Sequence, residues 1–187
     1  MDLSVWELWL PILISGVVLF FASAAAWMAL PHHKPEWKGL PNEEAVNQTI
    51  RDTGVSPGQY MFPFCQKSED WKSEEAKRRM KTGPHGTLAV WPGAPNMGVN
   101  MVCTVIFFTL VSFGLAYLAT MATLPRGAGF MPVFRFMGTA GILTYGSANL
   151  LNGIWFRRKM LADIADGIVY GLITGLIFGL MWPGTAA

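Results

Sequence analysis

Charged residues are scarce in this chain. Only 14% of its 187 residues are Asp, Glu, Lys or Arg, and 52% are hydrophobic, whereas soluble domains carry about 25% charged residues. Long stretches therefore have no charge, which excludes a disordered chain and an ordinary soluble enzyme. The formal net charge of +2 is too small for a nucleic-acid-binding protein, so we expect no nucleic acid among its partners.

Cysteine pairs and catalytic motifs are also lacking. Cys65 and Cys103 provide neither a disulfide framework nor a zinc-binding spacing. The sequence contains no nucleophile elbow, phosphate-binding loop, dinucleotide fingerprint or histidine–carboxylate metal motif. We therefore expect no cofactor and lean against an enzyme.

What the chain has instead is long apolar runs. A helix needs about 20 apolar residues to cross a bilayer, and four segments approach this length, at 8–30, 97–124, 136–156 and 167–183. Acidic residues and no basic ones precede the first run, so we expect a retained helix rather than a cleaved signal peptide. The predicted fold is an all-α membrane protein with one transmembrane helix in 1–30 and three in 97–187.

The connection at 31–96 is expected to fold as a small α+β insertion. Asn42 is typical of a helix N-cap and Gly54 of a helix end. Residues 60–65 and 88–91 are typical of short strands. The polar segment 68–82 predicts a helix that ends at Gly83. The spacing within it predicts the ion pairs Glu74–Arg78 and Glu75–Arg79.

Basic residues predict the orientation of the chain. The connection at 31–96 and the turn at 157–159 carry 12 of the 14 Lys and Arg residues, and only Arg126 and Arg135 lie on the other side. We therefore expect 31–96 in the cytoplasm and both termini outside. The stretches PHHKPEWKGLPNEEAV, SPGQYMFPF, GPHGTL and DGIVYGLITGLIFGLMWP resemble those of bacterial inner-membrane proteins, and this resemblance implies the location but no catalytic residue.

Few side chains are candidates for a site. His32, His33 and His85 lie in the connection at 31–96, where we interpret them as interfacial residues because adjacent histidines usually point apart. The alternative is a metal site that they share with Cys65.

Two acids precede the last predicted span. We interpret Asp163 and Asp166 as capping this helix. The alternative is a polar cation or proton site, to which Asn149 and Asn152 would add.

The last apolar segment carries a glycine stripe. Gly167, Gly171, Gly175 and Gly179 recur at every fourth residue, as in overlapping G-x-x-x-G motifs of a glycine zipper. Such a stripe lets another backbone approach closely. The partner is either another chain or another helix of the same chain, and the sequence leaves both open.

Together these features predict a non-enzymatic accessory, structural or assembly subunit of a membrane complex. Its expected partners are the lipid bilayer and either other membrane subunits or further copies of itself, through the glycine-striped helix. One alternative is a small transporter or channel with a polar site near Asp163 and Asp166. A second is a membrane-bound enzyme with an interfacial histidine site.

Overall fold

The structure is a computed structural model that describes residues 3–122 and 124–184. The chain divides into two compact units. The helical unit comprises Met1–Trp37 and Asn96–Ala187, within the described residues, and the small unit comprises Lys38–Pro95.

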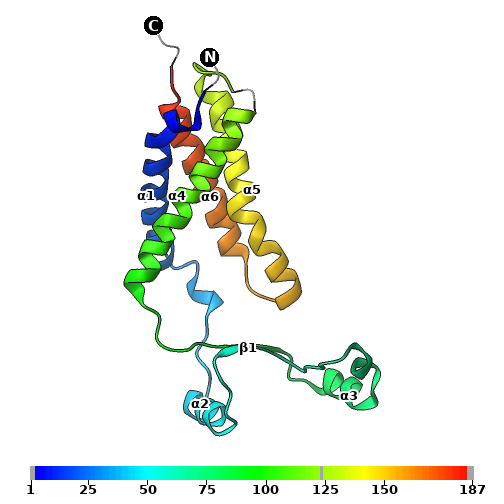
Figure 1. Ribbon diagram of the computed structural model, residues 1–187. Helices are drawn as coiled ribbons and strands as arrows, with labels where there is room; N and C mark the ends of the chain where they lie inside the picture. Colours follow the sequence, from blue (N-terminus) through cyan, green and yellow to red (C-terminus); the bar gives the residue numbers. More distant parts are fainter. Residues whose placement is uncertain (1–2, 123, 185–187) are drawn as a thin grey trace. The chain divides into compact units, whose positions relative to one another are not determined.

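The helical unit consists of four long helices that run alongside one another (Figure 1). They are α1 (Trp9–Met28), α4 (Met97–Met121), α5 (Phe130–Phe156) and α6 (Leu161–Met181), and a 3-10 turn, η1 (Val5–Leu8), precedes α1. Local signals start two of them. The Ser4 hydroxyl accepts a hydrogen bond in the first turn of η1, and the Asn96 side chain accepts from the Val99 N–H at the start of α4.

Three of these helices are long and apolar enough to cross a membrane: Val5–Met28, Met97–Met121 and Leu161–Met181. The third predicted span corresponds to α5, which has 27 residues but does not meet the same criterion among the described residues. Arg135, Asn149 and Asn152 lower its hydropathy. The expectation of four spans is therefore confirmed for three helices only.

The glycine stripe of α6 packs against α5. A Cβ atom at Gly171 would lie 2.4 Å from the backbone nitrogen of Ile142. At Gly167 and Gly175 it would lie 2.6 and 2.8 Å from α5 backbone atoms, and at Gly179 2.7 Å from an α5 aromatic ring. The sequence leaves open whether the glycine stripe contacts another chain or another helix of the same chain. In the structure it contacts α5 of the same chain. This face of α6 is not available to another subunit, because α5 already occupies it.

One end of the helical unit is closed by contacts between loops. After α6, the Trp182 indole N–H donates to the Pro125 carbonyl, which follows α4, over 3.0 Å. The Gly127 N–H donates to the Pro183 carbonyl over 2.8 Å. The last residues of α4 and α6 therefore lie at the same end of the helical unit, and these two helices run in the same direction (Figure 1).

The small unit contains two short helices and a two-stranded sheet. Its elements are α2 (Glu43–Asp52), β1 (Gly58–Phe62), the 3-10 turn η3 (Ser68–Lys72), α3 (Glu74–Thr82) and β2 (Gly86–Val90). The strands pair antiparallel, with Tyr60 opposite Leu88. Ala76 is the one buried residue of this unit, all of which is described, so the unit has almost no hydrophobic core.

Local signals account for most of these elements. The Asn42 side chain accepts from the Ala45 N–H at the start of α2, and the predicted helix ends Gly54 and Gly83 have φ angles of +67° and +65°. The prediction of one continuous helix at 68–82 is wrong. Ser73 has an extended backbone that interrupts it, and the Ser73 hydroxyl caps α3 by accepting from the Ala76 N–H.

The ion pairs of α3 follow a different spacing from the predicted one. Glu74 pairs with Lys77 and Glu75 pairs with Arg78, both three residues apart. The Glu74–Arg78 pair is therefore absent from the structure, because both side chains have nearer partners. The expected pair of Glu75 with Arg79 is present at 4.0 Å.

Candidate functional site

A tight turn after α1 brings two histidines together. The Lys34 N–H donates to the Pro31 carbonyl over 3.0 Å, and His33 has a right-handed helical backbone at the start of the 3-10 turn η2 (Lys34–Glu36). The rings of His32 and His33 lie 4.4 Å apart. The expectation that they point apart is wrong, because it holds for extended backbone and these residues form a turn.

Both histidines bind the same carboxylate. The Nε2 atom of His32 lies 2.8 Å from Oδ1 of Asp166, and the Nε2 atom of His33 lies 2.9 Å from Oδ2. The Tyr170 hydroxyl donates to Oδ2 over 3.3 Å. Asp166 is only 8% exposed. In the described part of the chain, the hydrogen-bonding partners of this buried carboxylate are thus two imidazole rings and one phenol.

Asp166 does not cap a helix, in contrast to the prediction. The helix α6 begins at Leu161, six residues earlier than the predicted span, and Met160 at its N-cap provides no side-chain hydrogen bond. Asp163 lies in the first turn of α6 and Asp166 in the second turn. The helix continues through both acids, and the histidines supply the partners that bury Asp166.

His33 is held from three sides. Its Nδ1 atom lies 2.7 Å from a carboxylate oxygen of Glu36, and its ring stacks on Trp27 with a centroid distance of 3.9 Å and an interplanar angle of 10°. Only 3% of the residue is exposed. The ring is therefore fixed in orientation, with Nε2 directed at Asp166.

The electrostatics favour a protonated His33. Ionised carboxylates only accept hydrogen bonds, so a ring between two of them donates from both nitrogens. Burial by itself lowers the pKa of His33, but the hydrogen bonds to Asp166 and Glu36 outweigh it and raise the pKa above its usual value. Trp27 stacks on the resulting cation.

A partly open cavity of about 310 Å³ adjoins this cluster inside the helical unit. Asp163 and Asn149, two of the predicted polar residues, line it together with Asp166, and Asn152 does not. The other lining residues come from all four helices: Ser23, Trp27, Phe107, Phe108, Thr144, Tyr145, Ala148 and Tyr170. Asp163 and Asp166 thus carry the carboxyl groups of this cavity, and no basic side chain lines it.

Around His33, carboxyl groups outnumber its single imidazolium. Oxygens of Glu36 and Asp163 and a ring nitrogen of His33 all lie within 4.8 Å of one another, and so do ligand atoms of His32, His33 and Asp166. Two like charges so close together repel unless a cation lies near them. We call these five residues, His32, His33, Glu36, Asp163 and Asp166, the polar cluster.

Basic residues lie near the polar cluster on one side. The Lys159 ammonium donates to the Pro35 carbonyl. A hollow of about 300 Å³ is lined by Glu36 and Trp37 together with the basic turn at 157–159. These side chains are largely exposed, so solvent screens their charges more than those of the buried carboxylate.

The remaining predicted candidates lie in the small unit. The His85 ring donates to the Met80 carbonyl over 2.6 Å, and the Cys65 sulfur lies 3.8 Å from the Arg79 guanidinium. In the part of the chain that the structure describes, neither residue belongs to a group of metal-ligand side chains.

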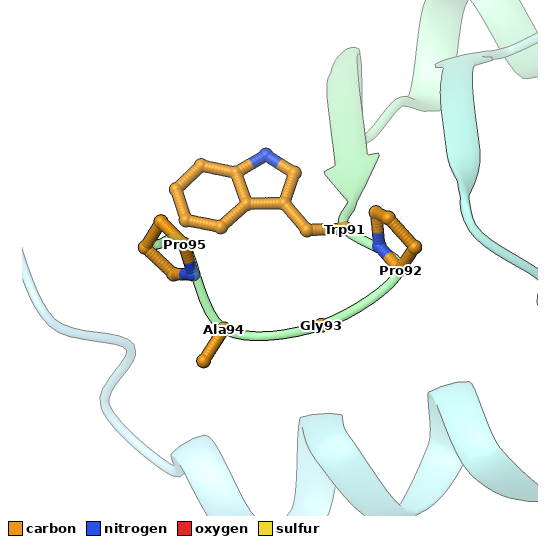
Figure 2. Close-up of a pocket in the computed structure, with 5 residues that line it drawn as sticks. All are labelled: Trp91, Pro92, Gly93, Ala94 and Pro95. Carbon is orange, nitrogen blue, oxygen red and sulfur yellow. The ribbon is translucent and has the colours of Figure 1, made fainter. Parts of the chain in front are cut away.

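The small unit also has a hollow of about 450 Å³ at its loop 91–95. Figure 2 shows the Trp91 indole extending over this loop toward the ring of Pro95. Its lining residues, Trp91 and 92–95, have no ionisable side chain. The hollow therefore offers apolar and backbone contacts but no acid–base or ligand chemistry.

Sequence reasoning did not find Glu36, Trp27 and Tyr170, and it did not group His32 and His33 with Asp166. Two signals were available. His33 and Glu36 are three residues apart, which suits a contact within a helical turn. The predicted topology also places 31–96 and 157–159 on one side of the membrane, and therefore the histidines near the start of the last helix.

Comparison of the chain with protein-family models, with curated proteins and with solved structures found no match.

Proposed function

We propose that the chain is a four-span integral membrane protein in which α5 is the remaining span. The support is geometric. The last residues of α4 and α6 lie at the same end of the helical unit, joined by the Trp182–Pro125 hydrogen bond. If both helices cross a membrane in the same direction, the chain between them must return across it. At about 1.5 Å per residue, the 27 residues of α5 are long enough to do so.

The proposed orientation keeps the polar cluster and the small unit on the cytoplasmic side of a bacterial inner membrane, with both termini outside. Basic residues near helix ends are retained in the cytoplasm. Lys34, Lys38 and the basic turn at 157–159 flank the helix ends on the cluster side, and Arg126 and Arg135 are the basic residues at the other end.

The function we propose is binding of a cation at the polar cluster, as in the binding site of a small transporter or channel. One observation carries it: the cavity beside α6 is lined by Asp163 and Asp166 and by no basic residue. Carboxylates removed from water attract a cation more strongly than exposed ones do, because the surrounding protein screens them less. The sequence suggested two separate alternatives, a metal site at the histidines and a cation site at the aspartates. This proposal combines them, since the histidines and the aspartates belong to one cluster.

Cation-dependent stabilisation tests this function. The purified full-length protein in mild detergent is heated with and without monovalent and divalent chloride salts at constant ionic strength. We expect at least one cation to raise the melting temperature, because a ligand of the folded state stabilises it by mass action. The rise should be smaller in Asp163→Asn, which removes one negative charge beside the site, and should persist in the control Asp70→Asn, a surface acid of the small unit. If no cation stabilises the wild type, the proposal fails.

The accessory-subunit function is a second candidate, favoured by the small unit. With Ala76 as its one buried residue, this unit exposes many large apolar side chains, which suits contact with another membrane protein or with the bilayer. They include Leu40, Met61, Phe62, Phe64, Trp71, Met80 and Trp91. The glycine stripe no longer supports this candidate, because α5 covers it.

A stoichiometric partner would establish the second candidate. The chain is purified from native membranes in mild detergent, and the molar ratio of any co-purifying protein is measured. We expect Phe64→Ser to lose such a partner and the control Glu44→Gln, on the surface of α2, to retain it. A wild-type chain that purifies alone, as a single copy, would contradict this function.

A further inference from the structure

We propose that the cation bound by the polar cluster is a divalent transition-metal ion, with the Nε2 atoms of His32 and His33 and the carboxylate of Asp166 as its ligands. This inference rests on the cation-binding function proposed above and names the class of ligand.

The donor set points to this class. Imidazole nitrogen is a good ligand for zinc, iron, nickel and copper, whereas magnesium and calcium prefer oxygen alone. Two imidazoles and one carboxylate with remaining open positions are the ligands of many catalytic and transport sites for such metals. All three potential ligand atoms lie within 4.8 Å of one another.

The distances suit an ion that replaces the present hydrogen bonds. Each Nε2 atom lies 2.8 or 2.9 Å from an Asp166 oxygen. Ligand atoms about 2.0–2.2 Å from a zinc ion lie roughly 3–3.5 Å from one another. The ligand atoms would therefore have to separate by only a few tenths of an ångström to admit the ion.

Glu36 is an independent sign of a metal ligand. Metal-binding histidines usually direct their other ring nitrogen at a carboxylate or carbonyl, which fixes the ring and leaves the ligand nitrogen facing the metal. His33 has this arrangement: Nδ1 lies 2.7 Å from Glu36, and Nε2 points at Asp166. Trp27 holds the ring plane by stacking on it.

The charges also suit a divalent ion. The polar cluster contains the carboxylates of Glu36, Asp163 and Asp166. A divalent ion among them would supply two positive charges. It would therefore neutralise these carboxylates more completely than a monovalent ion would, which favours its binding in a partly buried site.

Titration of the purified full-length protein tests the inference. The protein in mild detergent is stripped with a chelator and titrated with Zn²⁺, Mn²⁺, Mg²⁺, Ca²⁺ and K⁺ in a calorimeter. We expect one equivalent of Zn²⁺ to bind, and Mg²⁺, Ca²⁺ and K⁺ to bind at least 100-fold more weakly. Co²⁺ should give a visible absorption spectrum that Zn²⁺ abolishes, which reports that both ions occupy the same low-coordinate site.

Two variants complete the test. His32→Gln removes one ligand from a partly exposed position and should weaken Zn²⁺ binding at least tenfold. His85→Gln, in the small unit, should bind Zn²⁺ as the wild type does. Equal binding by His32→Gln and the wild type would overturn the assignment of the ligands.

The outcomes separate the two proposals. If only Mg²⁺, Ca²⁺ or K⁺ binds, and Asp163→Asn loses that binding, the transition-metal inference is overturned while the cation-binding function stands. If no cation binds to the wild type, both are overturned, and the histidines and Asp166 act as a structural ion pair.

Discussion

His33 and Asp166 are 133 residues apart in the chain, and a hydrogen bond of 2.9 Å joins them where the end of α1 meets the start of α6. Both residues are buried. The bond connects the turn after α1 to α6, the last long helix of the helical unit. It therefore links the polar cluster to the packing of the bundle, so a change at either residue should affect both.

We expect Asp166→Asn to destabilise the protein by about 1–3 kcal/mol, because an amide has one accepting oxygen in place of two and leaves a ring N–H of His32 or His33 without its partner. Asp163→Asn is the matched control: it removes an acid from the same helix, and in the described part of the chain Asp163 has no side-chain hydrogen bond. Denaturant unfolding in detergent, without added metal, measures both. Equal losses in the two variants would contradict the importance of the His33–Asp166 bond.

We expect Gly171→Ala to destabilise the bundle by about 1–3 kcal/mol, since the new methyl group would clash with the α5 backbone. Gly114→Ala in α4 is the control, because no atom lies within 4 Å of a Cβ at that position. The control should be neutral or slightly stabilising, since alanine favours helix more than glycine does. A Gly171→Ala protein that stays as stable as the wild type but loses a co-purifying subunit would show that the stripe contacts another chain.

Cysteine labelling tests the proposed topology. In a Cys65→Ser, Cys103→Ser background, a cysteine is introduced as Gly129→Cys, just before α5, or as Lys159→Cys, just after it. Intact cells are treated with a membrane-impermeant thiol reagent. We expect labelling of Gly129→Cys and protection of Lys159→Cys, because α5 would separate the two positions by one membrane crossing.

Two other patterns are informative. Labelling of Lys159→Cys alone would reverse the orientation and keep α5 as a span. Equal labelling of both positions in intact cells would mean that α5 does not cross the membrane.

We expect Ser112→Ala to leave stability unchanged or to raise it by about 1 kcal/mol. The Ser112 hydroxyl is fully buried in α4 and, among the residues that the structure describes, has no hydrogen-bond partner. Burying an unpartnered hydroxyl is unfavourable. Thr174→Val is a useful contrast, since the Thr174 hydroxyl donates to the Tyr170 carbonyl over 2.8 Å. Thermal unfolding in detergent compares them. A clear loss of stability in Ser112→Ala would indicate that this hydroxyl has a partner in the folded protein, either the Tyr145 hydroxyl or a buried water molecule.

The sequence by itself determined the features that depend on neighbouring residues. Apolar runs of sufficient length predicted three helices that are long and apolar enough to cross a membrane, because transfer into lipid depends on composition along one segment. Asn42 and Gly83 marked a helix start and a helix end, because capping and a positive φ are properties of a few residues. Ser73 is a local signal of the same kind that the sequence prediction missed: its side chain caps α3 and divides the predicted helix.

Only the tertiary structure decided how these elements contribute to a site. The glycine stripe showed that a backbone packs on α6, but which backbone depends on how the helices are arranged, and the structure has α5 there. That arrangement also brings the start of α6 to the turn after α1. His32, His33 and Asp166 were each identified as polar residues near helix ends, yet their shared hydrogen bonds depend on distances across the bundle. No local spacing encodes those distances, because they are set by side-chain packing between segments far apart in the chain.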